Sequence, residues 1–221
     1  MNSLFPGKKR FTNKDEKGEI FAQWTSNKLD SKAKVVCEVC NNGWMSGIDG
    51  QHAKPARSDL IAGKLDVPIT QSRAASIALF CFKTAAVFDL ISKNQRPFFT
   101  ITERYAFRES LTIPSNANMW MAGFVPIGKG NVHTGYFAAS TSLVNHFRMY
   151  VCTYAVGHFV FQLVAARTSQ RLEPMPGFEC VAVPFWPRFE TGLVWPLPFV
   201  LGTVPDFDSF SMRWKTVSID G

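Results

Sequence analysis

Two cysteines, Cys37 and Cys40, are the residues whose type and spacing most clearly offer chemistry. Only two residues separate them, and two thiolates at this spacing can bind one Zn²⁺ ion from a tight turn. Two apolar β-forming residues precede the pair, and an apolar helix could begin at Trp44, after Asn41, Asn42 and a glycine. This order of strand, two-cysteine turn and helix predicts a zinc knuckle, the second half of a treble-clef site.

A complete structural zinc site needs four ligands, and this chain contains a single Cys-x-x-Cys. His52 follows Cys40 by twelve residues and is the predicted third ligand. Residues 1–36 contain neither cysteine nor histidine. We therefore consider two states for Cys37 and Cys40: a site that binds Zn²⁺, and a knuckle that now holds its turn by packing alone.

A redox role for the cysteine pair is a third interpretation. It requires a βαβ context and a helix that begins near the first cysteine, because the positive end of a helix lowers the pKa of a thiol. We expect the helix at Gly43–Gln51 instead, with Asn41 or Asn42 as its N-cap. This placement favours metal binding over redox chemistry.

The string CEVCNNGWMS at residues 37–46, followed by a basic segment, resembles the second half of the HNH endonuclease-like module of bacterial and phage proteins. In that family a zinc treble clef supports a ββα-metal motif, and a histidine at the end of the first hairpin activates water. An asparagine or histidine from the helix binds a divalent cation that stabilises the phosphoryl transition state. The resemblance covers about residues 34–50. It implies a module over residues 1–64, in which Asn41 or Asn42 matches the helix-borne ligand or serves as a cap.

Two parts of the family pattern are absent from the sequence. The first Cys-x-x-Cys is missing, and so is the segment that carries the general-base histidine. We expect either a shortened form whose upstream half is missing or a module that has lost catalysis. If the chain were active, it would be a metal-dependent HNH-type endonuclease that needs a divalent cation.

Basic residues supply the predicted contacts to nucleic acid. The formal net charge is +7, which suits a polyanionic partner. Residues 1–36 contribute eight lysines and arginines against four acidic residues. The predicted contacts to DNA or RNA are Lys8, Lys9, Arg10, Asn41, Asn42, Lys54 and Arg57. The alternative for these side chains is a solvated surface with no specific partner.

The rest of the chain predicts an α+β body. Apolar residues at three- and four-residue spacing on most faces predict a long buried helix over residues 70–92. From Phe98 onward the sequence is typical of β-structure, with a hairpin of residues 148–155 and 158–166 around Gly157. Further strands are expected at residues 120–125, 135–139, 178–185 and 191–195, and an amphipathic helix at 206–217.

We therefore expect a small treble-clef, HNH-like module at residues 1–64 and a mostly antiparallel α+β domain at 65–221. Residues 1–10 lack the apolar core of a signal peptide, and the longest uncharged apolar run is too short to span a bilayer. We expect a cytoplasmic protein without a membrane partner. In that reducing compartment, Cys81, Cys152 and Cys180 are predicted to be buried free thiols.

Two functions fit these observations. The first is a nucleic-acid-associated, HNH-like protein that does not cleave its partner in this form. The second is a ligand-binding or protein-interaction domain, for example in phage–host conflict, whose zinc-knuckle remnant is purely structural. The large aromatic β-region favours the second, because nuclease chemistry does not need so large an additional domain.

Overall fold

The structure is a computed structural model that describes residues 9–14, 20–26, 35–91, 96–126, 132–140, 148–167, 177–178 and 180–214. It is an α+β fold, as predicted. The helical elements are α1 (Glu38–Cys40), η2 (Asn41–Met45), η3 (Ile48–Ala53), α2 (Lys54–Ile61), α3 (Gln71–Ile91), α4 (Ile101–Ser110) and α5 (Val204–Met212). The strands are β1 (Lys9–Lys14), β2 (Ile20–Ser26), β3 (Val67–Pro68), β4 (Ala117–Phe124), β5 (Val132–Ser140), β6 (Arg148–Val156), β7 (Phe159–Arg167), β8 (Ala182–Trp186), β9 (Val194–Trp195) and β10 (Val200–Leu201).

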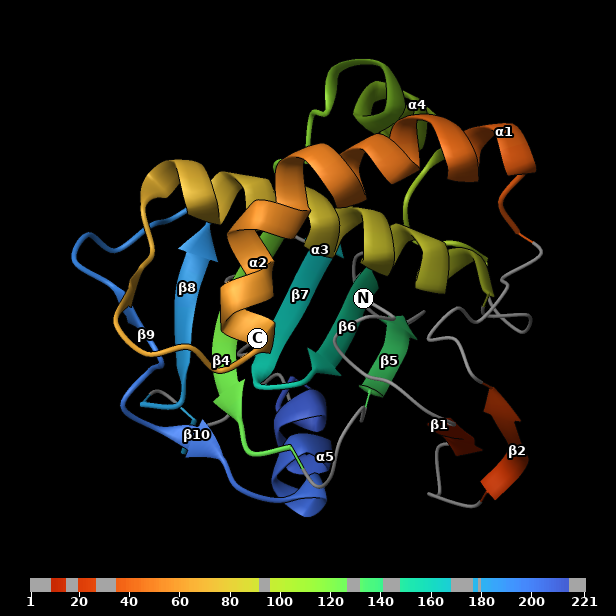
Figure 1. Ribbon diagram of the computed structural model, residues 1–221. Helices are drawn as coiled ribbons and strands as arrows, with labels where there is room; N and C mark the ends of the chain where they lie inside the picture. The colour runs from red at the N-terminus through yellow and green to blue at the C-terminus, as the bar shows by residue number, and fades with distance from the viewer. Residues whose placement is uncertain are drawn as a thin grey trace, which may run out of the picture.

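A six-stranded sheet forms the centre of the fold (Figure 1). Its order is β10-β4-β7-β6-β5, and β8 also pairs with β4. All pairs are antiparallel except that of β10 with β4. Strands β6 and β7 form the predicted hairpin, and Gly157 takes a positive φ of 56° at its turn. A glycine adopts this backbone conformation at little cost.

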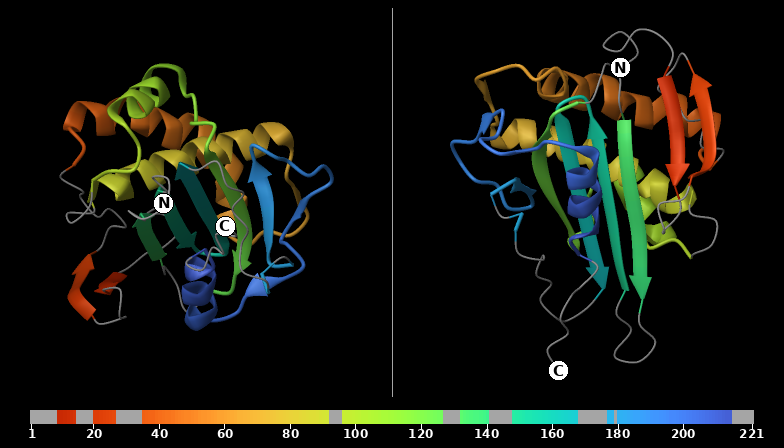
Figure 2. Two further views of the ribbon diagram at one scale, coloured as in Figure 1. Left: turned by 180° about the vertical axis from the view of Figure 1, so that it is seen from behind. Right: turned by 90° about the horizontal axis from the view of Figure 1, so that it is seen from below.

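Both faces of the sheet are covered, which follows from the alternation of side chains along a strand. On β7, Phe159, Phe161 and Leu163 belong to the core cluster that contains α3. Val160 packs instead in the cluster of Phe207 from α5. The helices α1 to α4 therefore lie on one side of the sheet and α5 on the other (Figure 2).

Helix α3 is the central helix predicted at residues 70–92. It is buried on two sides: Phe80 contacts Tyr154 and Phe161 of the sheet, while Phe82 packs edge-on against Phe99 and Phe107. By length and composition α3 could also cross a membrane, with a mean hydropathy of 1.8 in its most apolar window, and 56% of that window is buried inside the protein. Burial inside a domain core explains why this helix is apolar on most faces.

Helix α4 corrects the expectation that β-structure begins at Phe98. Thr100 caps this helix: its hydroxyl accepts a hydrogen bond from the backbone N–H of Glu103, and the Glu103 carboxylate accepts one from the backbone N–H of Thr100. This reciprocal pair is a capping box, which satisfies two backbone donors at the start of a helix. The aromatic residues around α4 suggested strands, but the capping box starts a helix there.

Buried residues on both sides of the predicted boundary at residues 64/65 belong to one cluster. Ile48, Leu60 and Ile61 belong to the same buried cluster as α3 and the sheet. The backbone N–H of His158, at the turn of the β6–β7 hairpin, donates to the carbonyl of Ile61 over 3.1 Å. Within the described residues, η3 and α2 thus share a core with α3 and the sheet.

Candidate functional site

The cysteine pair lies at the start of a kinked helical run that extends from α1 through α2. Cys37 is the N-cap, and its sulfur accepts a hydrogen bond from the backbone N–H of Cys40 over 3.3 Å. Gly43 has non-helical angles (φ −88°, ψ −115°), and the run bends there. Cys37 is exposed and Cys40 is half-buried, so both thiols lie near solvent.

This geometry corrects two expectations. Residues 35–36 form a turn and a bend rather than a strand, and the helix begins at Glu38, with Cys37 as its N-cap, rather than after Cys40. The cysteine side chain takes the capping role that we assigned to Asn41 or Asn42. Hydrogen bonds from Cys40, first from its thiol and then from its backbone amide, lower the pKa of Cys37. The helix start at the first cysteine therefore meets one of the two conditions for redox chemistry, whereas the βαβ context is not met because residues 35–36 form no strand.

The other exposed polar residues of the run lie on either side of the kink. Asn41 and Asn42 are exposed, and the Asn41 amide donates to the side chain of Asn42 over 3.5 Å. His52 and Lys54 are exposed further along, in η3 and at the start of α2. The structure thus brings the two asparagines together beside the cysteines.

Arg57 is not the surface phosphate contact that we expected. Its side chain is only 6% exposed, and its guanidinium lies 3.8 Å from the centre of the Phe80 ring and 3.4 Å from the Asp49 carboxylate. The ammonium of Lys83 on α3, 10% exposed, lies 2.6 Å from the same Asp49 oxygen. Burial lowers the pKa of both cations, and the charge of Asp49 opposes that shift.

The N-terminal contacts to nucleic acid lie at the margin of what the structure describes. Lys8 lies outside the described residues. Lys9 and Arg10 open β1, where they pair with Ser26 and Thr25 of β2 in an antiparallel hairpin. The role of these basic residues as phosphate contacts stays a prediction.

The remaining cysteines divide differently from the prediction. Cys81 and Cys152 are fully buried, and burial raises the pKa of Cys152 to about 12. Cys180 is exposed, so the expectation of a buried thiol is wrong there. Within the described ranges, the accessible thiols are therefore Cys37, Cys40 and Cys180.

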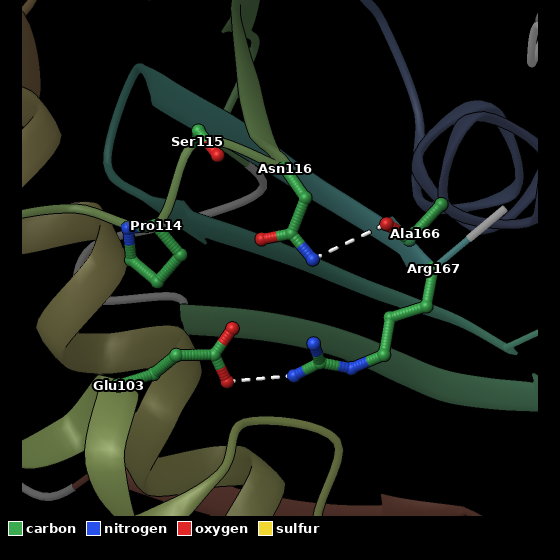
Figure 3. A pocket seen from close by; sticks show the side chains of 6 residues that line it. All are labelled: Glu103, Pro114, Ser115, Asn116, Ala166 and Arg167. Carbon is green, nitrogen blue, oxygen red and sulfur yellow. Dashed lines mark hydrogen bonds and ion pairs between the residues drawn. The ribbon is translucent and has the colours of Figure 1, made fainter. Parts of the chain in front are cut away.

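A polar hollow at the end of the sheet is a site that the sequence did not reveal. It has a volume of about 510 Å³ and is lined by Glu103, Pro114, Ser115, Asn116, Ala166 and Arg167 (Figure 3). Arg167 donates to Glu103 over 2.6 Å, and the Asn116 amide donates to the carbonyl of Ala166 over 3.2 Å. The Thr100-x-x-Glu103 pattern could have placed Glu103 at a helix start, but no local signal joins it to a strand 64 residues away.

No group of three or more His, Cys, Asp and Glu side chains that could hold a metal ion occurs in the described part of the chain. His52 therefore does not join Cys37 and Cys40. The pair supplies two of the four ligands that a structural Zn²⁺ site needs. No protein-family model matches this chain, and neither the curated proteins nor the solved structures contain a match for it.

Proposed function

We propose that this chain is a nucleic-acid-associated protein of the HNH-like class that does not cleave its partner in this form. The observation that carries the proposal is the helix start at residues 37–42, where Cys37, Asn41 and Asn42 are exposed together beside Cys40. This turn has the residue types of the family motif at the family's spacing. The net charge of +7 adds a general attraction to phosphate.

The basic contacts of this proposal are Lys8, Lys9, Arg10 and Lys54, with Asn41 and Asn42 as neutral donors. Arg57 is left out, since it is buried against Phe80. The proposal includes a Zn²⁺ ion shared by the thiolates of Cys37 and Cys40, with further ligands that the described residues do not supply. It also places the protein in the cytoplasm.

The absence of cleavage follows from the chemistry that an HNH-type reaction requires. A base must deprotonate the attacking water, and a divalent cation must take up charge on the phosphate. His52 is exposed, but it belongs to no metal-binding group of the described residues. The base and the cation are thus not provided at one place in the described part of the chain.

Salt dependence of DNA binding tests the association. We expect the affinity for a short fluorescent duplex to fall with salt, with a slope of log affinity against log salt of about −0.9 for each phosphate contact. Replacing Lys8, Lys9 and Arg10 by glutamine should flatten this slope. Arg57→Gln serves as a control, because Arg57 is buried and its loss should affect folding rather than phosphate contacts. A flat slope, or no binding at low salt, contradicts the proposal.

Plasmid cleavage with Mg²⁺, Mn²⁺ and Ni²⁺ tests the loss of catalysis. We expect no turnover from the wild type. Turnover by the wild type that disappears in His52→Ala would support the HNH-like class and contradict the proposed lack of cleavage. Elemental analysis of the purified protein, compared with Cys37→Ser, tests for zinc.

A second function, a ligand-binding or protein-interaction domain, is favoured by one observation. The polar hollow of Glu103, Asn116 and Arg167 lies at the end of the large sheet. Failure of every nucleic-acid assay together with saturable binding of a small molecule would favour this second function.

A further inference from the structure

The polar hollow contains hydrogen-bonding groups that the protein itself leaves unused. Asn116 Oδ1 is buried and accepts no hydrogen bond from the described residues. Thr100 donates to Glu103 Oε2 through its amide and its hydroxyl, and Arg167 donates to the same oxygen, so Oε1 accepts none of these bonds. A buried acceptor without a donor costs free energy, which a bound group can recover.

Arg167 contributes donors to the same space. Its Nη2 donates to Glu103 and to the carbonyl of Phe98, so its other N–H groups take no part in these bonds. The side chains of Glu103, Asn116 and Arg167 point toward one another across the hollow (Figure 3). Two acceptors and a donor therefore face one bound group.

The charge of the hollow selects for a neutral group. Glu103 and Arg167 form an ion pair, so their charges compensate each other. The complement of two acceptors and one donor is a group with two adjacent donors and one acceptor. Among the nucleobases, the Watson–Crick edge of guanine has this pattern, since N1–H and the N2 amino group donate and O6 accepts. The same edge of adenine, cytosine or uracil has a single donor position, and proteins read such edges on unpaired bases.

Arg148, which lies beside Arg167 but does not line the hollow, favours a ligand that carries phosphate. Arg148 on β6 lies directly opposite Arg167 on β7, and both guanidinium groups lie over the Phe98 ring. Hydrogen bonds to the carbonyls of residues 96 and 97 hold Arg148 in place. Arg104 follows Glu103 on α4 and donates to the carbonyl of Phe99. Guanidinium groups fixed in this way can bind phosphate without losing much side-chain freedom.

We infer that this hollow binds a guanine nucleotide, with the base edge on Asn116, Glu103 and Arg167 and the phosphate toward Arg148. A free nucleotide and an unpaired guanine in a nucleic acid share this chemistry. Binding of an unpaired guanine in a nucleic acid rests on the proposed function, whereas binding of a free nucleotide does not.

Calorimetric titration of the unmodified protein with mononucleotides is the first test. We expect guanosine monophosphate to bind about fivefold to tenfold more tightly than inosine monophosphate, which lacks only the N2 amino group. Adenosine and cytidine monophosphates should bind more weakly still. Equal affinity for the guanosine and inosine nucleotides overturns the inference, and this comparison does not depend on any variant folding correctly.

Asn116→Ala, with Asn118→Ala as its control, is the second test. Asn118 is an exposed residue two positions further on, in β4, which begins directly after Asn116. We expect Asn116→Ala to weaken guanosine monophosphate about fivefold to tenfold and Asn118→Ala to leave it unchanged, with thermal melts showing that both variants are folded. An equal effect of the two variants contradicts the inference.

Single-stranded oligothymidine with one central guanine or inosine separates the two sources. Preference for guanine, lost in Asn116→Ala, supports recognition within nucleic acid. Binding of the mononucleotide without binding of any oligonucleotide supports a free nucleotide and counts against the proposed function alone. A third outcome is salt-dependent binding of oligonucleotides with an affinity that changes neither with inosine nor with Asn116→Ala. This result overturns the inference about the hollow and remains consistent with the proposed function.

Discussion

Replacing Asp49 by asparagine should destabilise the protein strongly, because one carboxylate compensates two largely buried cations. Its Oδ1 lies 2.6 Å from the Lys83 ammonium and 3.4 Å from the Arg57 guanidinium. The asparagine has nearly the same volume, so packing changes little. What changes is the charge: two cations, each at most 10% exposed, lose their counter-charge.

The magnitude follows from the burial of the three side chains. Removing one partner of a fully buried ion pair costs about 3–5 kcal/mol. The Asp49 side chain is 41% exposed, so solvent screens part of this attraction. Discounting the buried value by about half gives about 2 kcal/mol for Asp49→Asn. With a urea slope of about 2 kcal/mol per M, the unfolding midpoint should fall by about 1 M.

Urea unfolding followed by circular dichroism measures this loss, with Asp59→Asn as the control. Asp59 also has two cationic partners, Lys64 at 2.8 Å and Arg73 at 2.9 Å, but the Lys64 side chain is 66% exposed. The control should lose less than about 1 kcal/mol. In a Lys83→Met background, Asp49→Asn should cost less than in the wild type. Equal losses for the two aspartates would refute the reasoning.

Three further predictions concern other parts of the molecule. Iodoacetamide should label Cys37 faster than the exposed Cys180 at pH 7, since the pKa of Cys37 is lowered; equal rates by mass spectrometry would contradict this. Phe82→Ala should cost about 3–5 kcal/mol in urea unfolding, and the half-buried Phe88 should cost less when truncated, so a larger loss at Phe88 would show that the buried face is misassigned. Burial acts to raise the pKa of Glu103, but its hydrogen bonds outweigh burial and the pKa is lowered. Its stabilisation is therefore present above the unfolded pKa, about 4.3, and lost as pH falls through the folded value, so Glu103→Gln should be less stable than the wild type at pH 7, and the difference should shrink as the pH falls below about 4.3.

The sequence predicted the elements whose signals are local and repeated. The three-four spacing of apolar residues indicated α3, and dense β-forming residues around Gly157 indicated the β6–β7 hairpin. Helix α4 was missed because aromatic residues dominate its surroundings, although the Thr100-x-x-Glu103 pattern marked its start. The helix start at Cys37 was missed because cysteine is not among the usual N-cap residues.

The candidate sites depend on contacts between distant segments, which a single sequence does not reveal. Arg57 read as a surface residue because the Phe80 ring beneath its guanidinium lies on another helix, and Asp49 was not singled out at all. The hollow joins Glu103 to Arg167 across 64 residues of sequence. Each of these side chains has an ordinary local context, and only the packing of the elements gives it a role.

The contact of α2 with the β6–β7 hairpin affects when the packing of α2 can be completed during synthesis. A Cβ atom on Gly157 would lie 2.3 Å from the carbonyl oxygen of Ile61, so the two segments meet backbone to backbone. The ribosome adds about 5–20 residues per second, so the hairpin emerges several seconds after α2. Until then the buried side of α2 lacks part of its partner surface. We expect the layer that contains α2 to complete its packing only after the β6–β7 hairpin has emerged.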